Sequence, residues 1–195
     1  MSSVEEVVLA LEAGKLVVLP TDTVYGLACR ADREDAVRAL STLKRRSSDQ
    51  PIALVASGVG PLVELIPELP VDHLVRGAFT LVVPNPARRL PWLTGNRPET
   101  IGVRLPRLSG PATEALLRVR VVAATSANLH GGIDPPRVED VPPSILAGVG
   151  AVLDIGELPG TPSTVIDLTG SEPRVLREGA VSAVEALALI ADNAE

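Results

Sequence analysis

Aromatic residues are almost absent from this sequence of 195 residues, which contains only Tyr25, Phe79 and Trp92. Hydrophobic residues nevertheless make up 46% of the chain, which is enough for a sizeable core. Valine, leucine, isoleucine and alanine must therefore fill that core. The scarcity of aromatic rings also removes the side chains on which nucleic-acid bases usually stack.

Cysteine is scarce as well, and acidic residues outnumber basic ones. Cys29 stands alone, so no disulfide can form within the chain, and we expect a reducing compartment. The net charge of −6 lacks the basic excess of a general nucleic-acid coat. No apolar run approaches the roughly 18 residues that span a bilayer, and the N-terminal segment is acidic where a secretory signal is basic. We therefore expect a cytoplasmic protein with no membrane segment.

The familiar nucleotide, metal and hydrolase motifs are missing. The sequence has no GxxxxGK[ST] loop, and its Gly-Val-Gly segments at 58–60 and 148–150 lack the third glycine of the dinucleotide fingerprint. His73 and His130 are far apart, so no spacing typical of metal ligands occurs. The absence of a GxSxG elbow weakens a hydrolase interpretation.

Alternating strand and helix patterns predict an α/β fold. Ser3 and Glu6 have capping-box spacing before a helix over 4–13, and the apolar run 15–20 is typical of a strand buried on both faces. We predict one domain over residues 1–195, a twisted open sheet of mixed parallel and antiparallel strands flanked by helices. The other expected helices are 32–46, 111–118, 138–146 and 181–191, and the other expected strands are 51–55, 79–84, 100–105, 121–124, 151–155, 164–168 and 174–176.

Residues 20–27 place two threonine hydroxyls, one carboxylate and the only tyrosine directly after a buried strand. In α/β sheets, ligands bind beyond strand ends, where loops gather polar groups. Thr23 and Tyr25 are therefore candidate ligand-binding residues. The alternative is a tight polar turn in which Asp22 accepts hydrogen bonds from backbone N–H groups.

Lys44, Arg45 and Arg46 lie at the end of the expected helix 32–46. Cations favour helix C-termini through the macrodipole, which is a purely structural explanation. Three successive cations are more than the stabilisation of a helix C-terminus requires. Lys44 and Arg46 could instead hold phosphates, Arg46 by its planar fork and Lys44 as a point charge.

Ser126 and Asn128 follow the expected strand 121–124. Because they are two residues apart, their side chains point the same way in an extended chain. Both side chains donate and accept hydrogen bonds, which suits ribose or phosphate oxygens or an adenine edge. The alternative is an ordinary turn that leads into Gly131 and Gly132.

Four single polar residues lie at strand ends, namely Thr100, Arg104, Ser163 and Arg177. Thr100 and Arg104 share one face of their strand. An arginine inside an apolar strand is costly unless an anion pairs with it. That anion could be a carboxylate of the protein or of a substrate.

These segments occur in an order that resembles the threonylcarbamoyl-AMP synthase family, with its YrdC-like domain. The resemblance runs from about residue 4 to about residue 182 and fits the short, single-domain form. The family's Lys-x-Arg and Ser-x-Asn tetrad corresponds to Lys44, Arg46, Ser126 and Asn128. The matching segments are PTDTVYGLA, KRR, VAATSANLHG, PSTVIDL and RVLREGA.

Some positions depart from the family pattern. Ser47 stands where a proline usually follows Arg46, and Arg76-Gly77-Ala78 replaces Pro-Gly-Pro. His130 stands where the segment after Asn128 usually continues to Ser-Gly. These departures bear on substrate loops and catalytic efficiency more than on the reaction class.

The resemblance implies a nucleotidyltransferase that joins L-threonine, bicarbonate and ATP into L-threonylcarbamoyl-adenylate and releases pyrophosphate. Mg²⁺ would bridge the ATP phosphates, with no tightly bound organic cofactor. A partner transferase would carry the threonylcarbamoyl group to the tRNA adenosine beside the anticodon. Lys44 and Arg46 would be the catalytic residues. The implied ATP-binding residues are Lys44, Arg46, Thr100, Ser126, Asn128 and Arg177, and the implied threonine-binding residues are Thr23, Tyr25, Arg104 and Ser163.

Three other interpretations stay open. A non-catalytic RNA-binding module could use the cations at 44–46 together with Arg118 and Arg120, and weak RNA binding could also accompany the enzyme activity; the acidic net charge and the scarcity of aromatics weigh against it. A related carbamoyl-adenylate-forming domain of hydrogenase maturation would need further domains. A degenerate homologue could bind nucleotide without turnover.

Overall fold

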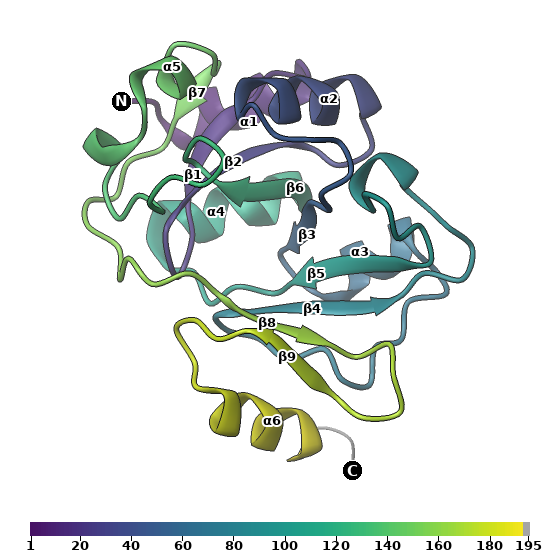
Figure 1. Cartoon of the computed structure of the whole chain (residues 1–195). Coiled ribbons are helices and arrows are strands. Elements are labelled where there is room, and N and C mark those ends of the chain that lie inside the picture. The colour runs from purple at the N-terminus through teal and green to yellow at the C-terminus, as the bar shows by residue number, and fades with distance from the viewer. Residues whose placement is uncertain (193–195) are drawn as a thin grey trace.

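The structure is a computed structural model that describes residues 1–192, so the last three residues of the predicted domain lie outside the described residues. Nine strands of the described chain form one sheet in the order β7-β1-β2-β6-β3-β5-β4-β8-β9. The sheet contains parallel pairs such as β3–β5 and β4–β8 and antiparallel pairs such as β2–β6 and β4–β5. The prediction of a mixed open sheet flanked by helices is therefore confirmed (Figure 1).

The strands are short and follow the apolar runs closely. They are β1 (Val17–Pro20), β2 (Tyr25–Arg30), β3 (Ala53–Ala56), β4 (Phe79–Pro84), β5 (Thr100–Arg104), β6 (Val121–Ser126), β7 (Ala151–Val152), β8 (Thr164–Asp167) and β9 (Arg174–Arg177). The helices are α1 (Val4–Glu12), α2 (Glu34–Leu43), α3 (Val59–Leu65), η1 (Pro91–Leu93), α4 (Gly110–Val119), η2 (Val138–Asp140), α5 (Pro143–Leu146) and α6 (Ala183–Asp192).

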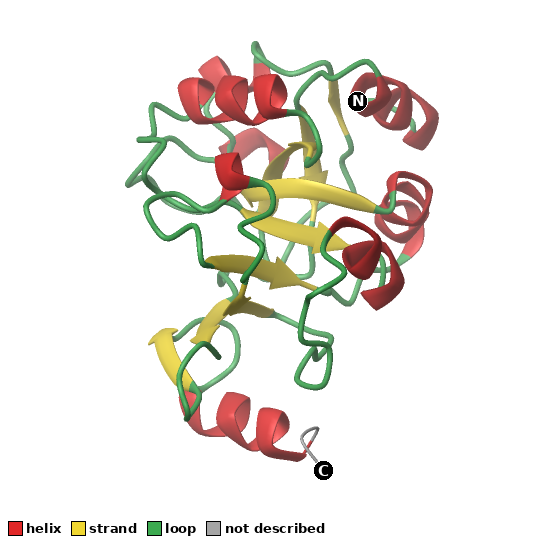
Figure 2. Ribbon diagram, turned by 90° about the vertical axis from the view of Figure 1, so that its right-hand side faces the viewer, coloured by secondary structure: helices red, strands yellow, loops and turns green. Residues whose placement is uncertain are grey.

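Helices cover both faces of the sheet and enclose two aliphatic cores. On one face α1 packs against α4, and their cluster buries Leu11, Val17 and Leu116. The other face carries the larger core, to which α2 contributes Leu40. Each such side chain stabilises the fold by about 1.5–3 kcal/mol, so aliphatic burial suffices without aromatic residues. α6 lies beyond β9, at the far end of the sheet from α1 and α2 (Figures 1 and 2).

The segment 20–27 is only partly the tight polar turn that its composition predicted. The turn spans Thr21 to Val24, where the Thr21 hydroxyl donates to the Val24 carbonyl at 2.7 Å. The chain then enters β2, which pairs with β1 and β6 on its two sides. The sequence Tyr-Gly-Leu-Ala-Cys-Arg has few β-branched residues, which is why this central strand was missed.

Two helix predictions need correction, and one helix was missed. Asp32 does not cap α2, because its carboxylate pairs with Arg30 and the N-cap position is Arg33. The helix expected over 138–146 is two short pieces, η2 and α5, because Pro142 and Pro143 interrupt the pattern. α3 was not predicted at all.

Within residues 1–192 no helix combines the length and apolar character required to cross a bilayer.

The buried thiol of Cys29 supplies a test of the fold. Burial raises the pKa of Cys29 to about 12, and the carboxylates of Asp35 and Asp32 add to this. Because the thiolate is the reactive form, we expect a chromogenic disulfide reagent to leave native Cys29 unmodified at mildly alkaline pH. The thiol should react fully once guanidinium chloride unfolds the protein. Rapid stoichiometric reaction of the native protein would contradict the position of β2 inside the sheet.

Candidate active site

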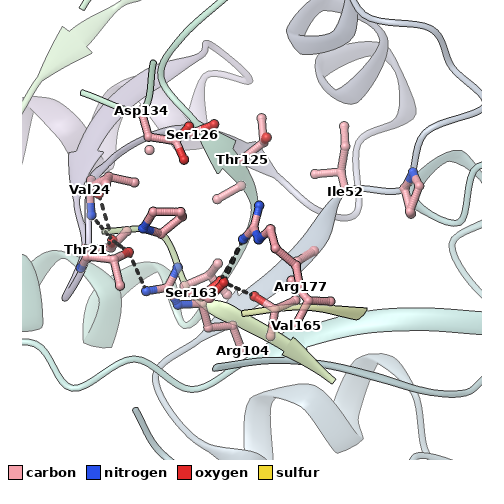
Figure 3. A pocket seen from close by; sticks show the side chains of 18 of the residues that line it. Thr21, Val24, Ile52, Arg104, Thr125, Ser126, Asp134, Ser163, Val165 and Arg177 are labelled. Carbon is pink, nitrogen blue, oxygen red and sulfur yellow. Dashed lines mark hydrogen bonds between the residues drawn. The ribbon is translucent and has the colours of Figure 1, made fainter. Parts of the chain in front are cut away.

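A polar cavity of about 200 Å³ lies between the turn that follows β1, the end of β6, and the strands β4, β5 and β8 (Figure 3). Six of the ten predicted site residues line it, namely Thr23, Arg46, Arg104, Ser126, Ser163 and Arg177. The other lining residues are Thr21, Val24, Gly26, Pro51, Ile52, Ala53, Val55, Thr80, Ala124, Thr125, Asp134, Pro162 and Val165. Segments far apart in the sequence therefore converge here.

Arg104 is the most buried cation of the cavity, with 9% of its surface exposed. Its Nη2 donates to the carboxylate of Asp22 and to the Thr23 hydroxyl at 2.8 Å. Its Nε–H is buried and has no hydrogen-bond partner among the described residues. Burial lowers the pKa of Arg104, Asp22 opposes this, and nearby Arg177 lowers it further. An unpartnered buried donor in a cavity favours an acceptor on a ligand.

Asp22 links two parts of the site. One carboxylate oxygen accepts from Arg104, and the other accepts from the backbone N–H of Arg107 at 2.9 Å. The anion that the lone arginine of β5 requires is therefore a carboxylate of the protein. Part of the guanidinium still faces the cavity, so a substrate carboxylate can bind as well.

Arg46 faces the cavity without a carboxylate partner in the described chain. Its guanidinium is held by neutral oxygens, with Nε donating to Gln50 Oε1 at 2.8 Å, Nη1 to Thr125 Oγ1 at 3.3 Å and Nη2 to the Pro51 carbonyl at 2.6 Å. Burial lowers the pKa of Arg46. The positive charge is thus oriented but not neutralised, as an anion site requires.

Arg177 and Ser163 meet at the opposite wall. Arg177 Nη2 donates to the Ser163 carbonyl at 2.8 Å, and the Ser163 and Thr80 hydroxyls lie 2.8 Å apart. Gly179 allows this approach, because a Cβ there would lie 2.2 Å from the Pro162 carbonyl oxygen. A larger residue at 179 would push β9 away from Ser163.

Lys44 and Asn128 do not line the cavity but hold its wall in place. The Lys44 ammonium is buried and donates to the Ser126 carbonyl at 2.5 Å, the Asn128 carbonyl at 2.8 Å and Asn128 Oδ1 at 2.7 Å. Burial lowers the pKa of Lys44 to about 8, and the Arg46 charge adds to this, while the nearby Asp134 carboxylate opposes it. In this structure all three ammonium hydrogens are directed at protein oxygens.

Tyr25 and Thr100 also lie outside the cavity lining. The Tyr25 hydroxyl lies 2.8 Å from Asp154 Oδ1 and 2.7 Å from the Gly156 carbonyl, and it accepts from the Ile155 N–H at 3.1 Å. Burial raises its pKa to about 12. The Thr100 hydroxyl donates to the Arg97 carbonyl at 3.1 Å. Thr100 is at the start of β5 and Arg104 at its end, so one strand length separates them.

Several cavity residues were not singled out from the sequence. Thr80 was overlooked, although it is a polar residue in the apolar strand β4, beside Arg104 in the register that pairs Leu81 with Val103. Asp134 could have been noticed in the sequence because it is a carboxylate directly before two prolines. Within the described residues, no group of three or more His, Cys, Asp or Glu side chains could hold a metal ion by itself.

Comparison with known proteins identifies the family. The model of the Sua5/YciO/YrdC family, described as "Telomere recombination", matches residues 9–179. The chain belongs to the Sua5/YciO/YrdC family. A Mycobacterium tuberculosis protein is 38% identical over 180 residues, which cover 89% of this chain and 82% of that protein. A Vibrio vulnificus protein named threonylcarbamoyl-AMP synthase is 32% identical over 92% of this chain and its own full length.

A solved relative extends the comparison to the fold. The crystal structure of Pyrococcus abyssi Sua5 complexed with L-threonine superposes with a TM-score of 0.85 at 31% identity, covering 96% of this chain and 57% of that one. The chain therefore spans little more than half of the archaeal Sua5 protein. The relatives' names are those of enzymes of the nucleotidyltransferase type, which confirms the predicted family and the prediction of an enzyme. The roles of individual site residues stay predictions.

Lys44→Met tests whether Lys44 supports the cavity wall. The substitution removes the ammonium donor from the Ser126 and Asn128 carbonyl oxygens, whereas Asn128 Oδ1 still accepts from the Ser126 hydroxyl. We therefore expect the free energy of unfolding to fall by about 1–3 kcal/mol. Urea denaturation measures this. Arg45→Met is the matched control, because Arg45 is an adjacent exposed cation and its loss should change stability little. Equal stability of the two variants would contradict the supporting role.

Tyr25→Phe tests whether the Tyr25 hydroxyl has a structural role or binds a ligand. Removing the hydroxyl takes the partner from the Ile155 N–H and from the Gly156 carbonyl, whereas Asp154 Oδ1 still accepts from the Gly156 N–H. We therefore expect a loss of about 1–3 kcal/mol in unfolding free energy. The threonine KM should stay unchanged, since the side chain is not in the cavity lining. A raised KM at full stability would instead support the predicted threonine contact.

Proposed function

We propose that this chain catalyses the formation of L-threonylcarbamoyl-adenylate from L-threonine, bicarbonate and ATP, with release of pyrophosphate. The observation that carries the proposal is the convergence of three arginines, Arg46, Arg104 and Arg177, on one cavity that is also lined by hydroxyls. The substrates fit this charge, because ATP, bicarbonate and the threonine carboxylate are all anions. The threonine complex of the P. abyssi relative supports the amino-acid part.

The residues of the cavity suit the two substrates, and Arg177 and Ser163 lie where the two would meet. Arg104, Thr23 and Ser163 would bind threonine, with the free Nε–H of Arg104 donating to its carboxylate. Arg46 and Arg177 would contact the phosphates, and Ser126 would contact the nucleotide. Lys44 and Asn128 would act through the backbone and side chains that they position. Thr100 would contact ATP only where the nucleotide extends along β5.

The reaction mainly requires that the substrates are positioned and that the charge of the transition state is stabilised. The threonine amine and bicarbonate form a carbamate with loss of water. A carbamate oxygen then attacks the α-phosphorus, and the bond to the β-phosphate oxygen breaks as pyrophosphate leaves. Because carbamate is already an anionic nucleophile, no dedicated general base is required. Arginines that face the cavity would stabilise the charge on the phosphorus oxygens and on the leaving pyrophosphate.

Mg²⁺ would enter the cavity bound to the triphosphate of ATP. Metal ions in phosphoryl-transfer sites bridge phosphate oxygens and neutralise developing charge, with few protein ligands. The lone Asp134 carboxylate of the cavity lining is compatible with an ion carried mostly by ATP. The adenylate would then pass to a partner transferase that modifies the tRNA adenosine next to the anticodon.

The direct test is incubation with ATP, bicarbonate and a panel of amino acids, followed by mass detection. A carbamoyl-adenylate that forms with threonine, and not with valine or serine, would support both the reaction and the substrate. AMP formation without any amino acid would contradict the proposal.

Arg104→Ala tests the threonine assignment. A charge-assisted hydrogen bond contributes about 1.5–3 kcal/mol, so we expect the threonine KM to rise about ten- to a hundredfold while the ATP KM changes little. Steady-state rates with each substrate varied separately measure both constants. Arg107→Ala is the control, because it removes an arginine nearby whose side chain is not in the cavity lining. An unchanged threonine dependence in a folded Arg104→Ala protein would refute the assignment.

A further inference from the structure

Asp134 is the only carboxylate among the described residues that line the cavity. Its Oδ1 accepts from Asn128 Nδ2 at 3.0 Å, and no described residue donates to its Oδ2. This half-buried carboxylate is the one negative charge among the described lining residues, whose other charges are arginines, and it interacts with the nearby Lys44 ammonium. It repels phosphates, so its free oxygen suits a part of the ligand that carries hydrogen-bond donors.

The surroundings hold this carboxylate in one orientation. Asn128 Nδ2 also donates to the Gly132 carbonyl at 2.6 Å, and Asn128 Oδ1 is fixed by the Lys44 ammonium. The next residue, Pro135, is tied to β2, because its carbonyl accepts from the Tyr25 N–H at 2.9 Å. Both the side chain and the backbone of Asp134 are therefore anchored before any ligand binds, which lowers the entropic cost of binding.

Asp134 lies beside Ser126 on one side of the cavity, across from Arg104, Ser163 and Arg177 (Figure 3). Arg104 and Ser163, which would bind threonine, thus lie on the far side of the cavity from Asp134. ATP offers two kinds of donor, its ribose hydroxyls and its adenine amino group, and a carboxylate that accepts from a ribose hydroxyl is a recurrent device in nucleotide sites. We propose that Asp134 accepts hydrogen bonds from the ribose hydroxyls of ATP and makes the site selective for ribonucleotides, an inference that rests on the proposed function.

The test is calorimetric titration of the wild-type protein with ATP, 2′-deoxy-ATP and 3′-deoxy-ATP. We expect ATP to bind about ten- to a hundredfold more tightly than at least one deoxy analogue, since a charge-assisted hydrogen bond is lost. In Asp134→Ala the ratio of the two affinities, for ATP and for that deoxy analogue, should fall to within about threefold. The ratio is the informative quantity, because the three ligands carry the same charge and any general change in electrostatic attraction cancels.

Two further variants keep the result interpretable. Asp140→Ala removes an exposed carboxylate six residues away and should retain the wild-type ratio. Asp134→Asn keeps the shape of the side chain but removes its charge. This variant should stay folded and lose most of the preference for ATP over the deoxy analogue. A wild-type ratio near one, or a full ratio in the Asp134 variants, would overturn the inference.

Repeating the titrations with EDTA separates the sugar from the metal ion. A ratio that persists without Mg²⁺ supports contact with the ribose. If Asp134→Ala weakens all three ligands equally, and only when Mg²⁺ is present, the carboxylate acts on the ion and the inference is wrong. A wild-type protein that binds no ATP at all would overturn the proposed function itself.

Discussion

The buried ammonium of Lys44 is the interaction on which the geometry of the cavity depends. A cation away from water is costly, and here three oxygens of Ser126 and Asn128 offset that cost. The backbone adds to the link, because the His130 N–H donates to the Lys44 carbonyl at 3.1 Å. The end of α2 is thereby joined to the end of β6. Arg46 and Ser126, which both line the cavity, are positioned by the two sides of this junction.

The same junction explains how an anion site can exist without a glycine-rich loop. A P-loop surrounds phosphates with backbone N–H groups at a helix N-terminus. Here the positive charge comes from guanidinium groups on or beside strands, and each is oriented by hydrogen bonds to protein oxygens. Arg104 alone has a carboxylate partner, Asp22. The charge of the cavity therefore depends on side chains whose orientation is set before a ligand arrives.

The sequence was sufficient to predict most strands and six of the residues that converge on the cavity, but not their roles. Apolar runs predicted β4 with the bounds that the structure shows, because a strand buried in a sheet needs little else. β2 was missed, and with it the direction of Tyr25. Strand alternation places Val24 and Gly26 toward the cavity and Tyr25 away from it. A recognised β2 would have indicated this. The pairing of Lys44 with Asn128 joins residues 84 positions apart, and no local pattern reports such a contact.

Gathering Arg46, Arg104 and Arg177 at one cavity also has an energetic consequence. Arg104 has an unsatisfied buried N–H, and Arg177 lowers its pKa, which is the effect of one positive charge on another. Burial lowers the pKa of Arg46 with no carboxylate to oppose it. Grouping these positive charges at one cavity therefore opposes folding, and the aliphatic cores on both faces of the sheet offset it. An anion that enters the cavity removes part of that repulsion, so affinity for anions and reduced stability of the free protein arise from the same three side chains.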